Sequence, residues 1–177
     1  MIADLQPHPA HPPSTLTSLT ARIERTATGF QITYDLGADL SALRIPAPAA
    51  PARTDELWKT TCFELFLKQP DGPGYFEFNF SPSTQWAAYS FTAPREGMAP
   101  LDIAAPTITP QQTAEGLTLT VQLDQPPSPP AATPLHAALT AIVEDATGAR
   151  SFWAITHPAE APDFHHPDGF VLDLPPE

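Results

Sequence analysis

The fold is decided by two short runs, Phe63-Glu64-Leu65-Phe66-Leu67 and Phe76-Glu77-Phe78-Asn79-Phe80. In each run every second side chain is apolar, which is the period of a β-strand with one buried face. The linker at 69–74 reads Gln-Pro-Asp-Gly-Pro-Gly and supplies glycines for a tight turn. The two runs therefore predict a hairpin. Its facing core pairs are expected to be Phe63 with Phe80, Leu65 with Phe78 and Leu67 with Phe76.

The same alternation recurs along the chain at 30–36, 117–123 and 170–174, and 135–143 and 151–156 are rich in β-formers. No long stretch has the apolar spacing of an amphipathic helix. Proline, at 24 of 177 residues, is confined to the segments between these runs, as expected of a residue that central strands exclude. About eight short strands predict an all-β protein, a sandwich or a Greek-key barrel. We expect one β-sandwich domain at 14–177 and a flexible, proline-rich tail at 1–13.

Composition excludes several classes of partner. Eight basic and twenty acidic residues give a net charge of −12, which argues against nucleic acid and against anionic membrane surfaces. The single cysteine, Cys62, excludes an internal disulfide framework and a thiolate zinc cluster. The chain has no apolar run of the roughly 18 residues that a membrane span needs, and its start does not resemble a signal peptide. We therefore expect a cytoplasmic protein.

The face of the hairpin opposite the core carries the first candidate site. There Glu64, Glu77 and Asn79 lie together, with Trp58 at the start of the first strand. A four-residue loop at 82–85 would return the chain with Ala87, Tyr89 and Phe91 beside the core phenylalanines and with Trp86 on the polar face. Carboxylates and an amide beside indole rings suit a sugar. The alternative is an ordinary solvated sheet face, and a one-residue change of register would move Trp86 to the other face.

The second candidate site is the polar segment from Trp153 to Phe170, which contains His157, Asp163, His165 and His166. Four interpretations stay open: a metal site formed by these three histidines and Asp163, a histidine base beside an aspartate, a ligand site without chemistry, and backbone capping. No serine or cysteine nucleophile accompanies the histidines, so no catalytic residue is predicted. Arg95, one of only eight basic residues, suits either a ligand anion or a surface ion pair with Glu96 or another of the many acidic residues.

Several segments taken in order resemble a known family. They are 57–67, 75–82, 86–89, 95–98 and 163–170, and the likeness spans about 15–174. In these segments the chain resembles the bacterial DOMON-like proteins, which are related to the family-nine carbohydrate-binding modules. The resemblance implies a jelly-roll type antiparallel β-sandwich whose relatives bind sugars or haem. It further implies Trp58 and Trp86 as candidates for a sugar clamp, and Met98 with His157 or His165 as candidate haem ligands.

Together the residues and the resemblance predict a non-catalytic module that binds a saccharide or another sugar-containing small molecule. No cofactor is expected. The alternatives are a haem or divalent-metal protein that uses the histidine-rich segment, and a subunit that binds another protein through its aromatic face. The stacking surfaces would be Trp58, Trp86 and Trp153, and the hydrogen-bonding groups would be Glu64, Glu77, Asn79, Arg95, His157, Asp163, His165 and His166.

Overall fold

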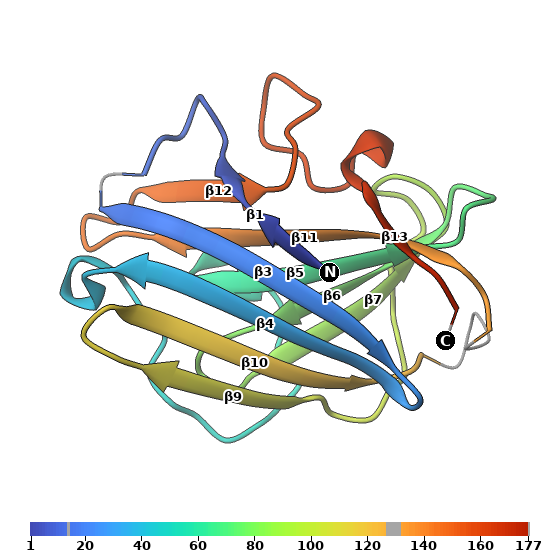
Figure 1. The fold of residues 1–177 in the computed structure, drawn as a ribbon, viewed down its shortest axis with the longest axis horizontal. Helices are drawn as coiled ribbons and strands as arrows, with labels where there is room; N and C mark the ends of the chain where they lie inside the picture. The colour runs from blue at the N-terminus through green and yellow to red at the C-terminus, as the bar shows by residue number, and fades with distance from the viewer. Residues whose placement is uncertain (14, 127–131, 177) are drawn as a thin grey trace.

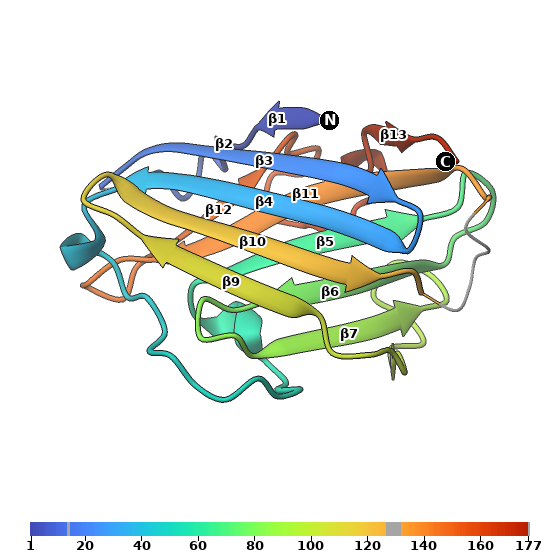
Figure 2. The ribbon, with the colours of Figure 1, turned by 60° about the horizontal axis from the view of Figure 1, so that its bottom comes forward.

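Two antiparallel β-sheets pack face to face around one apolar core (Figures 1 and 2). The computed structural model describes residues 1–13, 15–126 and 132–176. The predicted all-β sandwich is confirmed. Within the described residues, no helix has the length and apolar character needed to cross a membrane.

The strands of the first sheet are, in spatial order, β1 (Ile2–Asp4), β3 (Leu16–Thr26), β4 (Gly29–Ala38), β10 (Gly116–Asp124) and β9 (Thr107–Gln112). Those of the second sheet are β2 (Gln6–Pro7), β12 (Arg150–Ala154), β11 (Leu135–Glu144), β5 (Cys62–Lys68), β6 (Tyr75–Phe80), β7 (Trp86–Phe91) and β8 (Ala99–Pro100). Strand β13 (Leu172–Leu174) pairs with the start of β11. Three single-turn 3-10 helices complete the described elements: η1 (Leu40–Ala42), η2 (Leu57–Lys59) and η3 (Pro167–Gly169).

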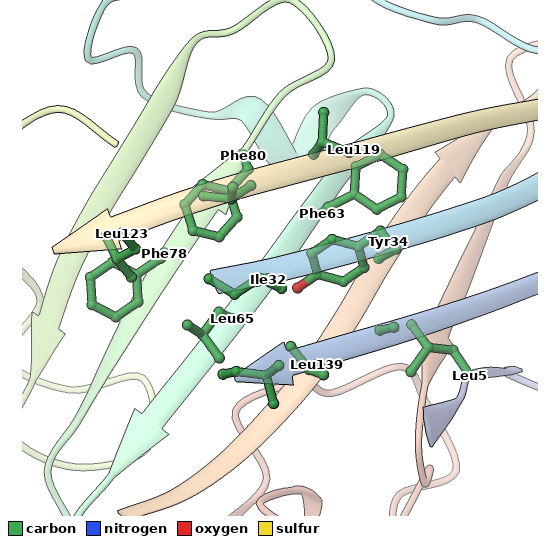
Figure 3. Packing of buried hydrophobic residues seen from close by; sticks show 14 of the residues in the cluster. Leu5, Ile32, Tyr34, Phe63, Leu65, Phe78, Phe80, Leu119, Leu123 and Leu139 are labelled. Carbon is green, nitrogen blue, oxygen red and sulfur yellow. The ribbon is translucent and has the colours of Figure 1, made fainter. Parts of the chain in front are cut away.

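The core between the sheets is built by the alternation that the sequence shows. Side chains from β5, β6 and β11 of the second sheet meet side chains from β4 and β10 of the first sheet (Figure 3). The labelled members are Leu5, Ile32, Tyr34, Phe63, Leu65, Phe78, Phe80, Leu119, Leu123 and Leu139. The Tyr34 hydroxyl, buried among them, donates a 2.6 Å hydrogen bond to the Glu64 carbonyl oxygen. This bond satisfies the one polar atom that the tyrosine brings into the core.

The predicted register of the first hairpin is confirmed. The three core pairs are Phe63 with Phe80, Leu65 with Phe78 and Leu67 with Phe76. The opposite face of the same hairpin consequently carries Glu64 next to Asn79 and Phe66 next to Glu77.

The predicted register of the next hairpin is wrong by one residue. Phe80 pairs with Trp86, so the loop has five residues, 81–85, instead of four. Ser81 and Ser83 explain the longer loop: the Ser81 amide donates to the Gln85 carbonyl at 2.9 Å, and the Ser83 hydroxyl donates to Ser81 Oγ at 2.8 Å. Because side chains alternate along a strand, this change places Trp86 in the core. It also places Ala87, Tyr89 and Phe91 on the other face.

The prediction of a flexible tail at 1–13 is also wrong. β1 pairs with β3 of the first sheet and β2 pairs with β12 of the second, so the segment joins an edge of each sheet (Figure 1). Leu5, between the two strands, is buried in the core. Pro7 is tolerated in β2 because an edge strand leaves one side of its backbone unpaired, and the other prolines of the segment lie outside β1 and β2. Residues 1–13 therefore belong to the sandwich.

Candidate functional site

The candidate site lies on the outer face, defined here as the face of the second sheet that points away from the first sheet. Two segments cover it. Residues 53–60 contribute Leu57 of η2, and residues 155–171 contribute Phe164 and Phe170, all packed in one apolar cluster with Phe66. The three polar residues predicted for this face are buried beneath this cover: Glu64 is 3% exposed, Glu77 6% and Asn79 1%. The outer face is thus a buried polar layer and not an ordinary solvated sheet face.

A row of hydrogen bonds crosses the centre of this layer. Thr140 of β11 donates its hydroxyl to Glu64 Oε2 at 3.1 Å, and Asn79 donates its amide to Glu77 Oε1 at 2.7 Å. Glu64 and Glu77 lie on neighbouring strands, displaced diagonally by two residues in the register, which puts their side chains within reach of each other. Among the described residues, no group donates a hydrogen bond to the remaining oxygens, Glu64 Oε1 and Glu77 Oε2.

The electrostatics of the layer follow from its burial. Desolvation raises the pKa of Glu64 well above its usual value, and the charge of Glu77 raises it further. Burial also raises the pKa of Glu77, against the opposing effects of the Asn79 hydrogen bond and the Arg95 charge. The two carboxyl groups together therefore hold a proton to a higher pH than a solvated glutamate would.

His165 forms one wall of the site. Its ring lies against Phe66, Tyr75 and Phe91, and burial, followed by the charge of Arg95, lowers its pKa to about 4. The Tyr75 hydroxyl accepts a 3.1 Å hydrogen bond from the Arg95 amide, which leaves its proton free for His165 Nδ1 at 2.7 Å. The neutral ring then carries its proton on Nε2, which lies 3.8 Å from the unpartnered Glu77 Oε2.

The segment 155–171 is fastened beside this wall. Arg95 pairs with Asp163 at 2.8 Å, so the ion-pair alternative for Arg95 is the one observed, with Asp163 as its acidic partner. A narrow hollow of about 10 Å³, no more than the room of one water molecule, lies between this segment and β11 and is lined in part by Thr140, Thr156, Asp163 and Phe164. Thr140 also bonds Glu64, but neither Glu64 nor Glu77 lines the hollow.

The structure thus brings together six of the predicted site residues, namely Glu64, Glu77, Asn79, Arg95, Asp163 and His165. Trp58 lies at the margin of this group, in η2 against β5 and β6, with 43% of its surface exposed.

The other four predicted residues lie elsewhere. Trp86 and Trp153 are buried in the core between the sheets, so neither ring offers a stacking surface. His157 bonds the Gln6 carbonyl of β2 at 2.8 Å. His166 accepts a hydrogen bond from the Asp168 amide and caps η3, as the capping interpretation expects.

The three histidines of this segment have different hydrogen-bond partners: the Gln6 carbonyl for His157, the Tyr75 hydroxyl for His165 and the Asp168 amide for His166. In the part of the chain that the structure describes, no three His, Cys, Asp or Glu side chains are grouped so that they could hold a metal ion. His157 and Met98 lie at opposite edges of the second sheet, beside β2 and next to β8. They cannot share a haem iron. His165 has its Nδ1 engaged by Tyr75.

Four further residues belong to the site and were missed from the sequence: Asp55, Tyr75, Tyr89 and Thr140. Tyr89 donates to Asp55 Oδ1 at 2.7 Å on the outer face, a position hidden by the wrong register of β7. Thr140 lies in a run whose alternation is weak, because β11 is buried on both faces. Tyr75 had a signal, since the first hairpin already places it on the same face as Glu77.

Comparison with known proteins adds evidence on the fold. No family model matches the chain, and no curated protein matches it. A crystal structure from Bacteroides uniformis, of a protein for which carbohydrate binding has been suggested, superposes with a TM-score of 0.68 at 14% sequence identity. The match covers 96% of this chain and 84% of that one. At this level of sequence identity, the superposition shows that the two proteins share a β-sandwich fold over almost the entire length of this chain. The DOMON resemblance stays a prediction.

Proposed function

We propose that the protein is a non-catalytic module that binds a saccharide on the outer face, over the row formed by Glu64, Glu77, Asn79 and Thr140. The observation that carries this proposal is the pair of unpartnered carboxyl oxygens, Glu64 Oε1 and Glu77 Oε2, on side chains that are otherwise buried. Sugar hydroxyl groups are donors that match such acceptors, and each bond to a charged acceptor contributes roughly 1.5–3 kcal/mol.

The chemistry around the row supports a sugar over a purely apolar ligand. Burying carboxyl groups costs free energy unless they gain partners, so a sheet face kept only for packing would favour apolar residues here. Trp58 presents an exposed indole at the margin of the site, and C–H faces of pyranose rings pack on such rings. The fold shared with the Bacteroides uniformis protein, for which carbohydrate binding has been suggested, is consistent with this role.

We propose binding without chemistry because the nucleophile and base candidates are engaged or shielded. Cys62, the only cysteine, is buried, and burial raises the pKa of its thiol, which disfavours the reactive thiolate. His165 is hydrogen-bonded to Tyr75, and its pKa of about 4 makes it a weak base.

The test is a titration of the ¹⁵N-labelled protein with a panel of mono- and disaccharides, followed by NMR amide shifts. We expect shifts confined to β5, β6, β11 and 155–171 at millimolar sugar, with the sugar signals unchanged over time. Glu77→Gln should weaken binding by about tenfold, the factor that one charge-assisted hydrogen bond represents. Glu115→Gln, at an exposed position between β9 and β10 of the first sheet, should leave binding unchanged. Absence of shifts across the panel would contradict the proposal, and turnover of a sugar would contradict its non-catalytic part.

A further inference from the structure

The buried carboxyl row of the outer face has no cation of its own. Neither Glu64 nor Glu77 forms an ion pair with a lysine or arginine of the described residues. The nearest basic group is His165 Nε2, 3.8 Å from Glu77 Oε2, and with a pKa of about 4 this ring is neutral at pH 7.

The basic side chains around the face are already engaged. Arg95 is paired with Asp163 at 2.8 Å, and Lys59 with Glu56 at 2.7 Å. Arg53 donates to the carbonyl oxygens of Ala88 and Leu101 at 3.0 and 2.6 Å, and the ammonium group of Lys68 lies 5.6 Å from the centre of the Phe170 ring. Arg95 acts on Glu77 through its charge, but none of these side chains forms an ion pair with Glu64 or Glu77, so the face retains an excess of acidic groups.

Aromatic rings accompany the carboxyl groups on this face. Tyr75 stacks on Phe91 with ring centres 4.8 Å apart, and Tyr89 lies on the same strand as Phe91, two residues away. Tyr89 bonds a further carboxylate, Asp55, at 2.7 Å. Carboxylates combined with aromatic faces form the environment that organic cations prefer, because both present negative potential to an ammonium group.

We propose that the saccharide bound here is an amino sugar, whose ammonium group binds to Glu64 Oε1 and Glu77 Oε2. This inference rests on the proposed function and specifies its ligand class. An ammonium group donates up to three hydrogen bonds, so it can use both unpartnered oxygens at once. A neutral hydroxyl group donates one.

A metal ion fits the same charge less well. Metal sites in proteins need several anionic or imidazole ligands around one point, and the described part of the chain has no such group of three. An ammonium group needs only the two oxygens and tolerates ring faces on its other sides.

Binding of an ammonium group at the carboxyl row should release a proton, which distinguishes it from binding of a neutral sugar. Burial and mutual repulsion raise the pKa of both glutamates, so without ligand the pair favours holding a proton. An ammonium group that takes the place of this proton releases it to solvent, whereas a neutral sugar releases none.

The test is isothermal titration calorimetry with glucosamine, glucose and N-acetylglucosamine at about pH 6.5, more than one unit below the pKa typical of an α-amino group. We expect glucosamine to bind at least about tenfold more tightly than the two neutral sugars. Titrations in two buffers of different ionisation enthalpy measure the protons released. The released number should be positive for glucosamine and zero for glucose.

Glutamine variants test whether the preference for glucosamine and the proton release depend on the carboxyl row. Glu64→Gln and Glu77→Gln keep the side-chain shape, and each should remove the preference for glucosamine and the proton release. Glu115→Gln should keep both. Equal affinity for the three sugars, or a preference that survives in both Gln variants, would overturn the amino-sugar inference and leave the saccharide proposal standing. If none of the three sugars binds, both proposals are overturned. The proton measurement on the unaltered protein decides the inference even where a variant does not fold.

Discussion

The two faces of the second sheet are equally shielded from water but differ in chemistry. On the core face, Phe63, Leu65 and Phe78 pack against the first sheet in an apolar environment (Figure 3). On the outer face, Glu64, Glu77 and Asn79 are almost as buried, yet they are covered by residues 53–60 and 155–171 and not by a sheet. Alternation along a strand therefore predicts which side chains share a face, but not whether a polar face is exposed.

Burial on the two faces contributes differently to the free energy of folding. Burial of apolar area stabilises the fold by roughly 25 cal/mol per Å², so the core face needs no other explanation. Burial of carboxyl groups opposes folding unless partners compensate. The outer face carries two such groups, and no described residue donates a hydrogen bond to the second oxygen of either; the proposed saccharide would supply these missing donors.

The largest effect is expected on the core face. Phe78→Ala should lower the free energy of unfolding by about 3–5 kcal/mol, because it removes a fully buried ring and leaves a cavity. Urea unfolding measures the loss. Phe76→Ala on the same strand is the control: its ring is only partly buried at the margin of the core, so its loss should be clearly smaller. Equal losses of unfolding free energy in the two variants would mean that Phe76 is as much a part of the core as Phe78.

The second largest effect tests whether the core includes the N-terminal segment. Leu5→Ala should lower the free energy of unfolding by about 2–4 kcal/mol, since Leu5 is 2% exposed between β1 and β2. Ile2→Ala, in the same segment but 70% exposed, should change it by less than about 0.5 kcal/mol. Thermal or urea unfolding of the two variants is sufficient. A neutral Leu5→Ala would restore the flexible tail that the prolines suggested.

The sequence was a good guide where a local pattern decides the structure. The β5–β6 register follows from the alternation of Phe63, Leu65, Phe78 and Phe80 together with the turn at 69–74, since a shift of one residue would turn phenylalanines away from the core. The β6–β7 register does not, because the hydroxyl hydrogen bonds of Ser81 and Ser83 add one residue to the loop, and the apolar residues of β7 suit either face.

The placement of the two segments that cover the outer face could not be predicted from the sequence, for a different reason. It depends on contacts between residues far apart in the chain, such as Tyr75 with His165 and Arg95 with Asp163. These contacts join strands to a loop without regular structure, and no periodic pattern encodes them. Polar residues in that loop could be recognised as candidates, but His157 and His166 could not be separated from His165 before the loop was placed.

A smaller effect is expected from the outer face, where the buried glutamates should make the free energy of unfolding depend on pH. The folded protein raises the pKa of Glu64 and Glu77 above their unfolded values, so the stability that comes from their proton is complete below about pH 4.3 and is lost as the pH rises through the folded pKa. The slope is at most about 1.4 kcal/mol per pH unit for each group. The variant Glu64→Gln/Glu77→Gln should therefore lose less stability than the unaltered protein as the pH rises.

Urea unfolding from about pH 4.3 upward, through the folded pKa of the two groups, measures this difference. His165 contributes in the opposite direction below about pH 6.5, because its pKa is lowered to about 4 in the folded state. Both proteins carry His165, so its contribution cancels in the difference between their curves. Parallel curves for the variant and the unaltered protein would show that the carboxyl groups are solvated and that the outer face is not a buried layer.

The smallest effect on stability is expected from the ion pair that holds the cover of the outer face. A double-mutant cycle of Arg95→Ala and Asp163→Ala should give a coupling of about 0.2–1 kcal/mol, since the arginine is mostly exposed. Hydrogen exchange of the amides in 155–171 should nevertheless become faster in both single variants, because the pair fastens a loop and not a strand.

The exposed pair of Arg22 and Glu24 on β3 is the matched control. Its cycle should give a coupling of similar size with no change of exchange in 155–171. Unchanged exchange in Arg95→Ala and Asp163→Ala would mean that the other contacts of the segment, among them the packing of Phe164 and Phe170 and the His165–Tyr75 hydrogen bond, hold it in place without the ion pair. Faster exchange would instead show that the ion pair fastens the cover over the carboxyl row.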